Sequence, residues 1–239
     1  MLEEARQRFF REAETAGKLN HPNIVTIFDA GEEHDLAYIA MEFLQGEDLT
    51  PYTRPAHLMP MLEVITLVKQ IALALDYAHK AGVVHRDIKP ANVMYDRTLG
   101  VAKVTDFGIA RITDSSKTKT GMVLGTPSFM SPEQLAGKHI DGRSDLFSLG
   151  VMLYQLLTGH LPFVGSSMAE LMYRITQQPA TDPRQYTPKM PAILVKIILK
   201  ALEKDLGQRF QTGAHFAQVL AKLEVAIKGV ADAQSSNGT

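Results

Sequence analysis

The chain has 239 residues, of which 45% are hydrophobic and 21% charged, so it can bury the core of one large domain or of two small ones. Its 25 Lys and Arg residues nearly balance its 26 Asp and Glu residues, which argues against the basic surface of a nucleic-acid-binding protein. The absence of cysteine excludes disulfides, thiolate metal sites and cysteine nucleophiles, and no apolar stretch is long enough for a membrane helix. We therefore expect a cytoplasmic protein with no membrane segment in this chain and no nucleic-acid partner.

The N-terminal part of the chain predicts a helix followed by two strands. Apolar residues recur at every third or fourth position over residues 2–19, which is the spacing of an amphipathic helix. Pro22 ends this pattern, because proline cannot extend a helix and restricts the residue before it. Two short apolar runs at 24–28 and 36–43 flank a polar turn at 31–35, and they predict an antiparallel pair of strands.

The rest of the chain predicts a mainly helical structure. Residues 44–60 hold three prolines and predict a connecting segment with at most a short helix. Short strands are predicted at 83–84, 93–94 and 101–104, and a long exposed loop at 111–128. Helices are predicted from Met61 to a stop at Gly82, at 145–158, after a capping-box pattern that begins at Ser167, at 191–203 and at 212–228.

The strongest chemical signal is the segment HRDIKPAN at residues 85–92. It matches the pattern H-R-D-x-x-x-x-N, in which the Asp accepts the proton of an attacking hydroxyl and the Asn holds a metal ion. The motif DFG follows at 106–108, GTP at 125–127 and SPE at 131–133. Each motif alone is more often a turn or a solvated loop, but chance does not explain their order and spacing. On these motifs the sequence resembles the protein kinases.

The residue types of these motifs also suit phosphoryl transfer, which mainly requires neutralised charge and reacting oxygens held in line. Asp87 suits the base, and Asp106 with Asn92 suits magnesium, which keeps its own waters and substrate phosphates. Lys89 is placed to meet the transferring phosphate. The resemblance implies ATP with Mg²⁺ or Mn²⁺, and Ser or Thr hydroxyls of protein substrates, because Lys89 and Thr126 stand where Ser/Thr kinases carry these residues.

The resemblance covers about residues 2–228 and implies an α+β, protein-kinase-like fold. We expect residues 1–44 to form a small partial N-terminal lobe, with helix C, two strands and the hinge. Residues 45–230 are expected to form a complete, mainly helical C-terminal lobe, and residues 231–239 a disordered tail. The family's glycine-rich loop and Val-Ala-x-Lys strand have no match before Glu12. We therefore expect that the first three strands are missing, through truncation, a mispredicted start or a split gene.

The resemblance also assigns residues around the nucleotide. It places Met41 at the guard position of the pocket, the backbones of Glu42 and Leu44 against adenine, and Met94 beneath the base. It also places Glu12, with Glu14 as the alternative, at the glutamate of helix C that pairs with the missing lysine. A methionine on a strand is more often plain core, and both methionine assignments are compatible with an apolar site.

Other residues are expected to support the site. His85 should be packed beneath Phe107 and act neither as base nor as metal ligand. The resemblance implies that Asp145 anchors the backbone of the catalytic loop and that Glu133 and Arg209 form a buried ion pair. Because buried charge is tolerated when it is paired, we expect both members of the pair to be structural. Arg86 should receive a phosphate from the activation loop, for which the favoured acceptors are Thr118 and Thr120.

Two other functions stay open at this point. A catalytically silent kinase-fold module that binds or regulates partners is favoured by the missing lysine alone. A small-molecule kinase is disfavoured by the elements at 125–127 and 131–133, which dock protein substrates in the family. Together with RSD at 143–145, the GTP motif is most similar to the bacterial Ser/Thr kinases, so a Ser/Thr protein kinase is the first hypothesis.

Overall fold

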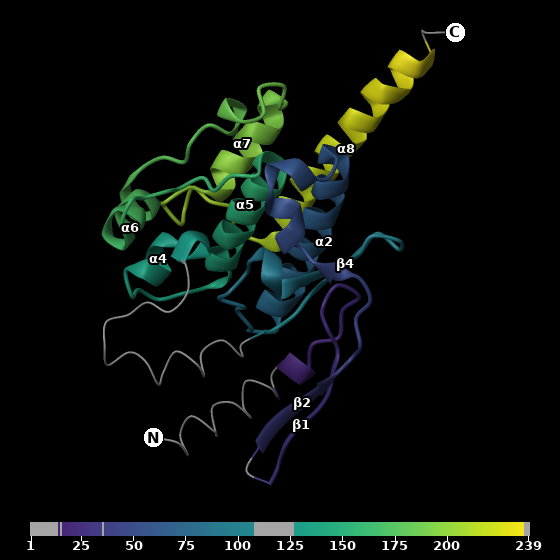
Figure 1. Cartoon of the computed structure of the whole chain (residues 1–239), viewed down its shortest axis with the longest axis vertical. Coiled ribbons are helices and arrows are strands. Elements are labelled where there is room, and N and C mark those ends of the chain that lie inside the picture. The colour runs from purple at the N-terminus through teal and green to yellow at the C-terminus, as the bar shows by residue number, and fades with distance from the viewer. Residues whose placement is uncertain (1–13, 15, 35, 108–126, 237–239) are drawn as a thin grey trace.

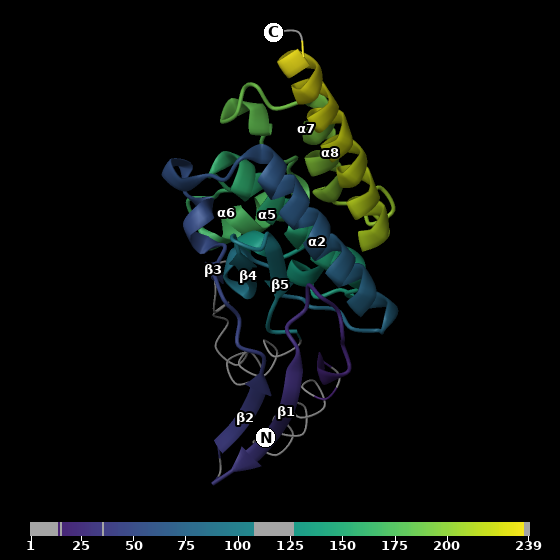
Figure 2. The ribbon, with the colours of Figure 1, turned by 90° about the vertical axis from the view of Figure 1, so that its right-hand side faces the viewer.

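A computed structural model describes residue 14 and residues 16–34, 36–107 and 127–236. The described residues form a projecting β-hairpin and a larger helical body, from whose other end the last helix extends (Figure 1). A small second sheet lies at the end of the body that faces the hairpin (Figure 2). This is the α+β arrangement that the sequence predicts, with few strands near the N-terminus and mainly helices after them.

The hairpin pairs strand β1 (Ile27–Glu33) with strand β2 (Leu36–Met41) in antiparallel register. The predicted strand pair is therefore confirmed, but β1 continues through most of the segment predicted as a turn. At Gly31 the missing side chain lets the Tyr38 ring of the facing strand lie close, because a Cβ atom there would be 2.6 Å from the Tyr38 hydroxyl oxygen. Ile24, which we expected to begin the first strand, instead forms a parallel bridge with Val104 of the second sheet.

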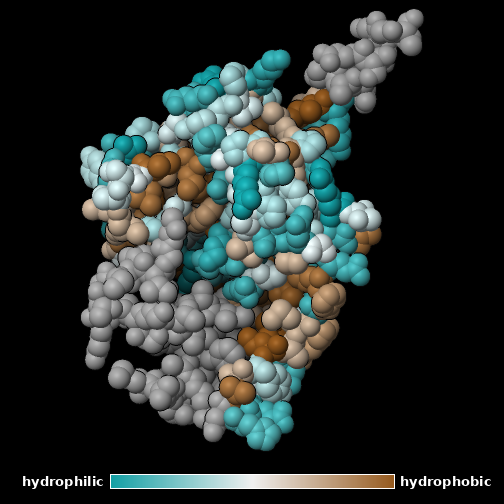
Figure 3. Space-filling view, in the orientation of Figure 1, coloured by the Kyte–Doolittle hydropathy of each residue, from teal (hydrophilic) through white to brown (hydrophobic). Residues whose placement is uncertain are grey.

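Large hydrophobic side chains of the hairpin and of the segment that follows it face solvent. Phe28, Leu36 and Phe43 are the most exposed of them, and hydrophobic surface gathers over this part of the molecule in Figure 3. A two-stranded hairpin is at best marginally stable in water. The hairpin therefore gains little stability from its own packing.

The second sheet has the strand order β3–β4–β5, with β3 at Glu47–Asp48, β4 at Val93–Asp96 and β5 at Val101–Val104. It confirms the strands predicted at 93–94 and 101–104. The prediction of a strand at 83–84 is wrong. The Val83 amide instead donates to the carbonyl of Ala78, and Gly82 has a left-handed φ of 78°, so these residues end the preceding helix.

Helix α5 (Gly142–Thr158) is buried on nearly every side and forms the centre of the body, and α2 (Met61–Lys80) packs against it. Both helices lie where the sequence predicts them. The remaining helices are α4 (Pro132–Leu135), α6 (Met168–Gln177), α7 (Ala192–Ala201) and α8 (Gly213–Ser236), with short 3₁₀ helices at Thr50–Thr53, Pro55–His57, Pro90–Asn92, Pro127–Phe129 and Pro183–Gln185.

The C-terminal helix differs from the prediction. We expected the helix to end at residue 228 and residues 231–239 to be a disordered tail, but α8 continues to Ser236. Once a helix is nucleated, each added residue contributes a further hydrogen bond, so a polar but helix-compatible sequence can prolong it. No helix in the described ranges is long and apolar enough to cross a membrane.

Helices α2 and α8 are joined by a charged clamp at Glu224. This largely buried carboxylate contacts the ammonium groups of Lys69 on α2 and Lys228 on α8, the latter at 2.8 Å, and also the Thr66 hydroxyl at 3.2 Å. Hydrogen bonds from Lys228 and Lys69 hold the pKa of Glu224 well below its usual range, at about 2.

The Glu224 clamp predicts a pH-dependent loss of stability. Because the folded pKa is below the unfolded value of about 4.5, the contribution is complete above that value and is lost as the pH falls towards 2. Urea unfolding of the wild type and of Glu224→Gln at pH 7, 5 and 3 should show a difference in the free energy of unfolding that is largest at pH 7 and smallest at pH 3. An equal difference at all three values would contradict the clamp.

Candidate active site

The loop from His85 to Asn92 connects helix α2 to strand β4 and is fixed to the buried helix α5. The two oxygens of the Asp145 carboxylate accept the backbone amides of His85, at 2.8 Å, and of Arg86, at 2.7 Å. The predicted anchoring contact of Asp145 is therefore present. His79 of α2 adds a third contact to this carboxylate, 2.7 Å from its Nε2 atom, which the sequence analysis missed.

Three of the predicted catalytic residues form one cluster. The ammonium group of Lys89 lies 2.6 Å from Oδ2 of Asp87, and the amide nitrogen of Asn92 donates to the same oxygen at 2.9 Å. Asn92 also donates to the backbone carbonyl of Asp87 at 2.8 Å, so its side chain closes the loop on itself. The arrangement holds one carboxylate oxygen of Asp87 with two donors and can keep a proton acceptor in a fixed orientation.

His85 lies beneath Phe107, as the sequence predicts. The two ring centroids are 4.6 Å apart in an edge-on arrangement, and both side chains are buried. The two ring nitrogens of His85 are occupied: Nε2 donates to the Thr105 carbonyl at 2.7 Å, and Nδ1 accepts the Asp87 amide at 3.2 Å. With both ring nitrogens engaged, His85 suits packing and not proton transfer.

Asp106 and Asn92 supply the oxygen atoms that a magnesium ion would need. The Asp106 side chain is exposed, and its backbone is left-handed, with φ of 60°. Both hydrogen bonds of the Asn92 side chain use its nitrogen, which leaves the amide oxygen open among the described residues. The described part of the chain contains no group of three His, Cys, Asp or Glu side chains placed to hold a metal. The donor set fits an ion that is also held by substrate phosphates.

The residues assigned to the hinge follow strand β2. The Glu42 amide donates to the Thr26 carbonyl, and its carboxylate accepts the Thr26 amide at 2.7 Å and the Lys103 ammonium at 2.7 Å. Burial raises the pKa of Glu42, but the bonds from Lys103 and Thr26 outweigh it and leave the pKa below its usual value. The backbone amide of Glu42 is therefore already hydrogen-bonded within the protein. The side chains of Leu44 and Met94 are half-buried.

The predicted ion pair between Glu133 and Arg209 is buried. Two nitrogens of the Arg209 guanidinium contact the two Glu133 oxygens at 2.8 and 3.2 Å, and the Ser144 hydroxyl donates to the same carboxylate. Arg209 also donates to the backbone carbonyls of Glu203 and Arg143. Burial alone would raise the pKa of Glu133, but Arg209 and Ser144 lower it overall. The pair joins α4 to the segment that follows α7.

Several predicted residues lie outside the described part of the chain, namely Glu12, Thr118, Thr120 and Thr126. The alternative to Glu12 is described: Glu14 is exposed and pairs with Lys18 one helical turn away, at 3.0 Å. Its carboxylate is therefore paired on the surface.

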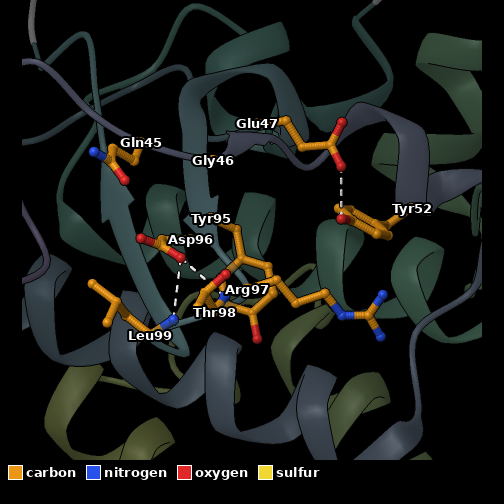
Figure 4. Close-up of a pocket in the computed structure, with 9 residues that line it drawn as sticks. All are labelled: Gln45, Gly46, Glu47, Tyr52, Tyr95, Asp96, Arg97, Thr98 and Leu99. Carbon is orange, nitrogen blue, oxygen red and sulfur yellow. Dashed lines mark hydrogen bonds between the residues drawn. The ribbon is translucent and has the colours of Figure 1, made fainter.

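A pocket of about 510 Å³ is lined by residues of strands β3 and β4 and of the segments beside them (Figure 4). Its walls are fixed by internal hydrogen bonds, since the Tyr52 hydroxyl donates to Glu47 and the Asp96 carboxylate accepts two backbone amides. The lining residues are Gln45, Gly46, Glu47, Tyr52, Tyr95, Asp96, Arg97, Thr98 and Leu99. None of them belongs to the Asp87 cluster or to the predicted nucleotide contacts, so this pocket is separate from the candidate active site.

Comparisons with known proteins agree on one class. A family model described as the protein kinase domain matches residues 1–222. The chain is 41% identical over 222 residues to the serine/threonine-protein kinase PknB of Mycobacterium leprae, covering 90% of this chain and 36% of the relative. It is 41% identical over 207 residues to the serine/threonine-protein kinase PrkC of Bacillus subtilis, covering 86% of this chain and 32% of the relative. The chain thus spans about a third of the length of these relatives.

A solved structure is also similar. The crystal structure of Rad53 1-466 in complex with AMP-PNP matches with a TM-score of 0.76 and 28% sequence identity. The match covers 88% of this chain and 53% of that one.

Proposed function

Because the chain belongs to the protein kinase family, as the match over residues 1–222 shows, we propose that it transfers the γ-phosphate of ATP to serine and threonine hydroxyls of proteins. Its fold is protein-kinase-like, as the similarity to the Rad53 structure shows. The serine/threonine specificity is supported by the names of the bacterial relatives and by Lys89, which stands two residues after the proposed base.

The observation that carries this proposal is the hydrogen-bonded cluster of Asp87, Lys89 and Asn92. In the proposed reaction the free face of the Asp87 carboxylate accepts the proton of the substrate hydroxyl, and Lys89 stabilises charge on the phosphate. Asn92 and Asp106 would hold magnesium, which supplies neutralising charge to the phosphates when bound. The anchoring of the loop by Asp145 keeps the cluster oriented before substrate arrives.

The Asp106→Asn variant tests the metal assignment. Transfer is measured in a chimera in which the glycine-rich loop and Val-Ala-x-Lys strand of a related kinase precede residue 1, because the 239 residues contain no match to either. The substitution keeps size but removes a negative ligand, so activity should fall at low magnesium and recover partly when magnesium is raised. Asp87→Asn should not recover. Equal behaviour of the two variants across a magnesium titration would contradict the assignment.

The second candidate function is a catalytically silent module that binds nucleotide or a protein partner. Its sequence basis is that residues 1–239 hold no match to the family's glycine-rich loop or to the lysine of its Val-Ala-x-Lys strand. Calorimetric titration of the chimera with Mg-ATP, run beside a transfer assay, tests whether the catalytic residues of this chain are themselves silent. Because the chimera supplies the loop and the lysine, nucleotide binding without transfer would favour a silent module, whereas transfer would show that Asp87, Asn92 and Asp106 are competent.

A further inference from the structure

Arg86, the residue before the proposed base, has an unusual backbone conformation. Arg86 has a φ of 70°, in the left-handed region that L-residues other than glycine rarely adopt. Such a conformation persists only where the surrounding structure holds it. Because Asp87 follows directly, the groups that hold Arg86 also set the direction in which the Asp87 carboxylate leaves the backbone.

Two side chains from different helices hold the two backbone groups of Arg86. The Arg86 amide donates to Oδ1 of Asp145 on α5 at 2.7 Å, and the Arg86 carbonyl accepts a hydrogen bond from Nε2 of Gln134 on α4 at 2.8 Å. Asp145 is the expected anchor. Gln134 is 48 residues away in sequence from Arg86, and neither the kinase resemblance nor the sequence pattern assigned it a role.

The orientation of the Gln134 amide is fixed by its own helix. Its oxygen accepts the backbone amide of Ser131 at 2.9 Å, while the Ser131 hydroxyl accepts the Gln134 amide at 3.3 Å, which together form a capping box. Because the oxygen is committed to Ser131, the nitrogen is the atom that faces the Arg86 carbonyl. The neighbouring Glu133 holds the same short helix to Arg209.

We propose that Gln134 is a positioning residue for Asp87. Its side chain links helix α4 to the strained backbone at Arg86 of the catalytic loop. The role rests on the proposed phosphotransfer function, since it acts through the base and touches no substrate. A fixed carboxylate matters because small displacements of a catalytic group slow a reaction strongly, by up to about 100-fold for 1 Å.

Gln134→Glu is the decisive variant. A glutamate can still accept the Ser131 amide and keep the capping box, but an ionised carboxylate cannot donate to the Arg86 carbonyl. In the chimera we expect kcat to fall about 10- to 100-fold while KM for ATP changes less than about twofold. Gln134→Met, which adds no charge, should show the same fall in kcat. Unchanged kcat in both variants would overturn the proposal.

A second readout does not depend on catalysis. In the 239-residue chain, hydrogen exchange of the amides at 85–89 should become faster in Gln134→Glu, with α7 unchanged. The matched control is Gln211→Glu, which removes amide hydrogen bonds to the carbonyls of Leu206 and Arg209 away from the loop. It should leave kcat and exchange at 85–89 as in the wild type.

The two readouts separate the two claims. If no form of the chimera transfers phosphate but exchange at 85–89 accelerates only in Gln134→Glu, the proposed function fails while the positioning role of Gln134 stands. If transfer is present but exchange at 85–89 is unchanged in Gln134→Glu, or accelerates equally in Gln211→Glu, the positioning role of Gln134 is wrong.

Discussion

Asp87→Asn should lower phosphate transfer by the chimera about 10²- to 10⁴-fold without unfolding it. The substitution keeps the size of the side chain and can still accept a hydrogen bond from Asn92, which in the native chain donates to Oδ2 of Asp87 at 2.9 Å. What it removes is the proton acceptor and the negative partner of Lys89. The measurement is the steady-state rate of transfer from radiolabelled ATP to a protein substrate, with the thermal unfolding temperature recorded for each protein.

The matched control for this experiment is Asp182→Asn. Asp182 also pairs with a cation, since its carboxylate lies 2.6 Å from Arg184, but it is on the surface in the segment between α6 and α7. Its loss should leave the rate unchanged. A near-normal rate for Asp87→Asn, or an equal loss in both variants, would show that Asp87 is not the base.

Arg209→Leu should destabilise the chain by about 3–5 kcal/mol, which is the usual effect of removing one partner of a buried ion pair. The Arg209 side chain is fully buried, and its loss leaves the Ser144 hydroxyl as the side-chain donor to the Glu133 carboxylate among the described residues. It also frees the carbonyls of Arg143 and Glu203 from their hydrogen bonds. Urea unfolding followed by circular dichroism measures the loss.

Two further variants make this prediction specific to the buried pair. Arg184→Leu removes an exposed pair with Asp182 and should lower the free energy of unfolding far less than Arg209→Leu, because solvent screens an exposed pair. The double variant Glu133→Leu with Arg209→Leu should be more stable than Arg209→Leu alone, because it no longer buries an unpaired charge. If Arg209→Leu and Arg184→Leu had similar effects, the Glu133 pair would not support the fold as we describe.

The sequence predicted the features that depend on local pattern or on a linear motif. Helices α2 and α5 carry long apolar stripes, and the cluster of Asp87, Lys89 and Asn92 lies within one short loop, so their contacts followed from the motif. The pairs of Asp145 with the loop and of Glu133 with Arg209 are long-range, and they were found only because the family resemblance supplied them.

Other features could not be read from the sequence, because they depend on packing between distant segments. Val83 carries a β-branched side chain typical of strands, yet its amide ends helix α2. His79 and Gln134 reach partners 66 and 48 residues away, and no local signal marks a histidine near a helix end or a glutamine in a capping box as a support for a catalytic loop.

Phosphoamino-acid analysis of a protein substrate incubated with the chimera, radiolabelled ATP and magnesium tests the phosphotransfer function most directly. We expect label on phosphoserine and phosphothreonine, dependent on magnesium and nearly abolished by Asp87→Asn. Absence of label, or label that persists at the wild-type level in Asp87→Asn, would contradict the assignment of Asp87, Asn92 and Asp106 as a phosphotransfer site.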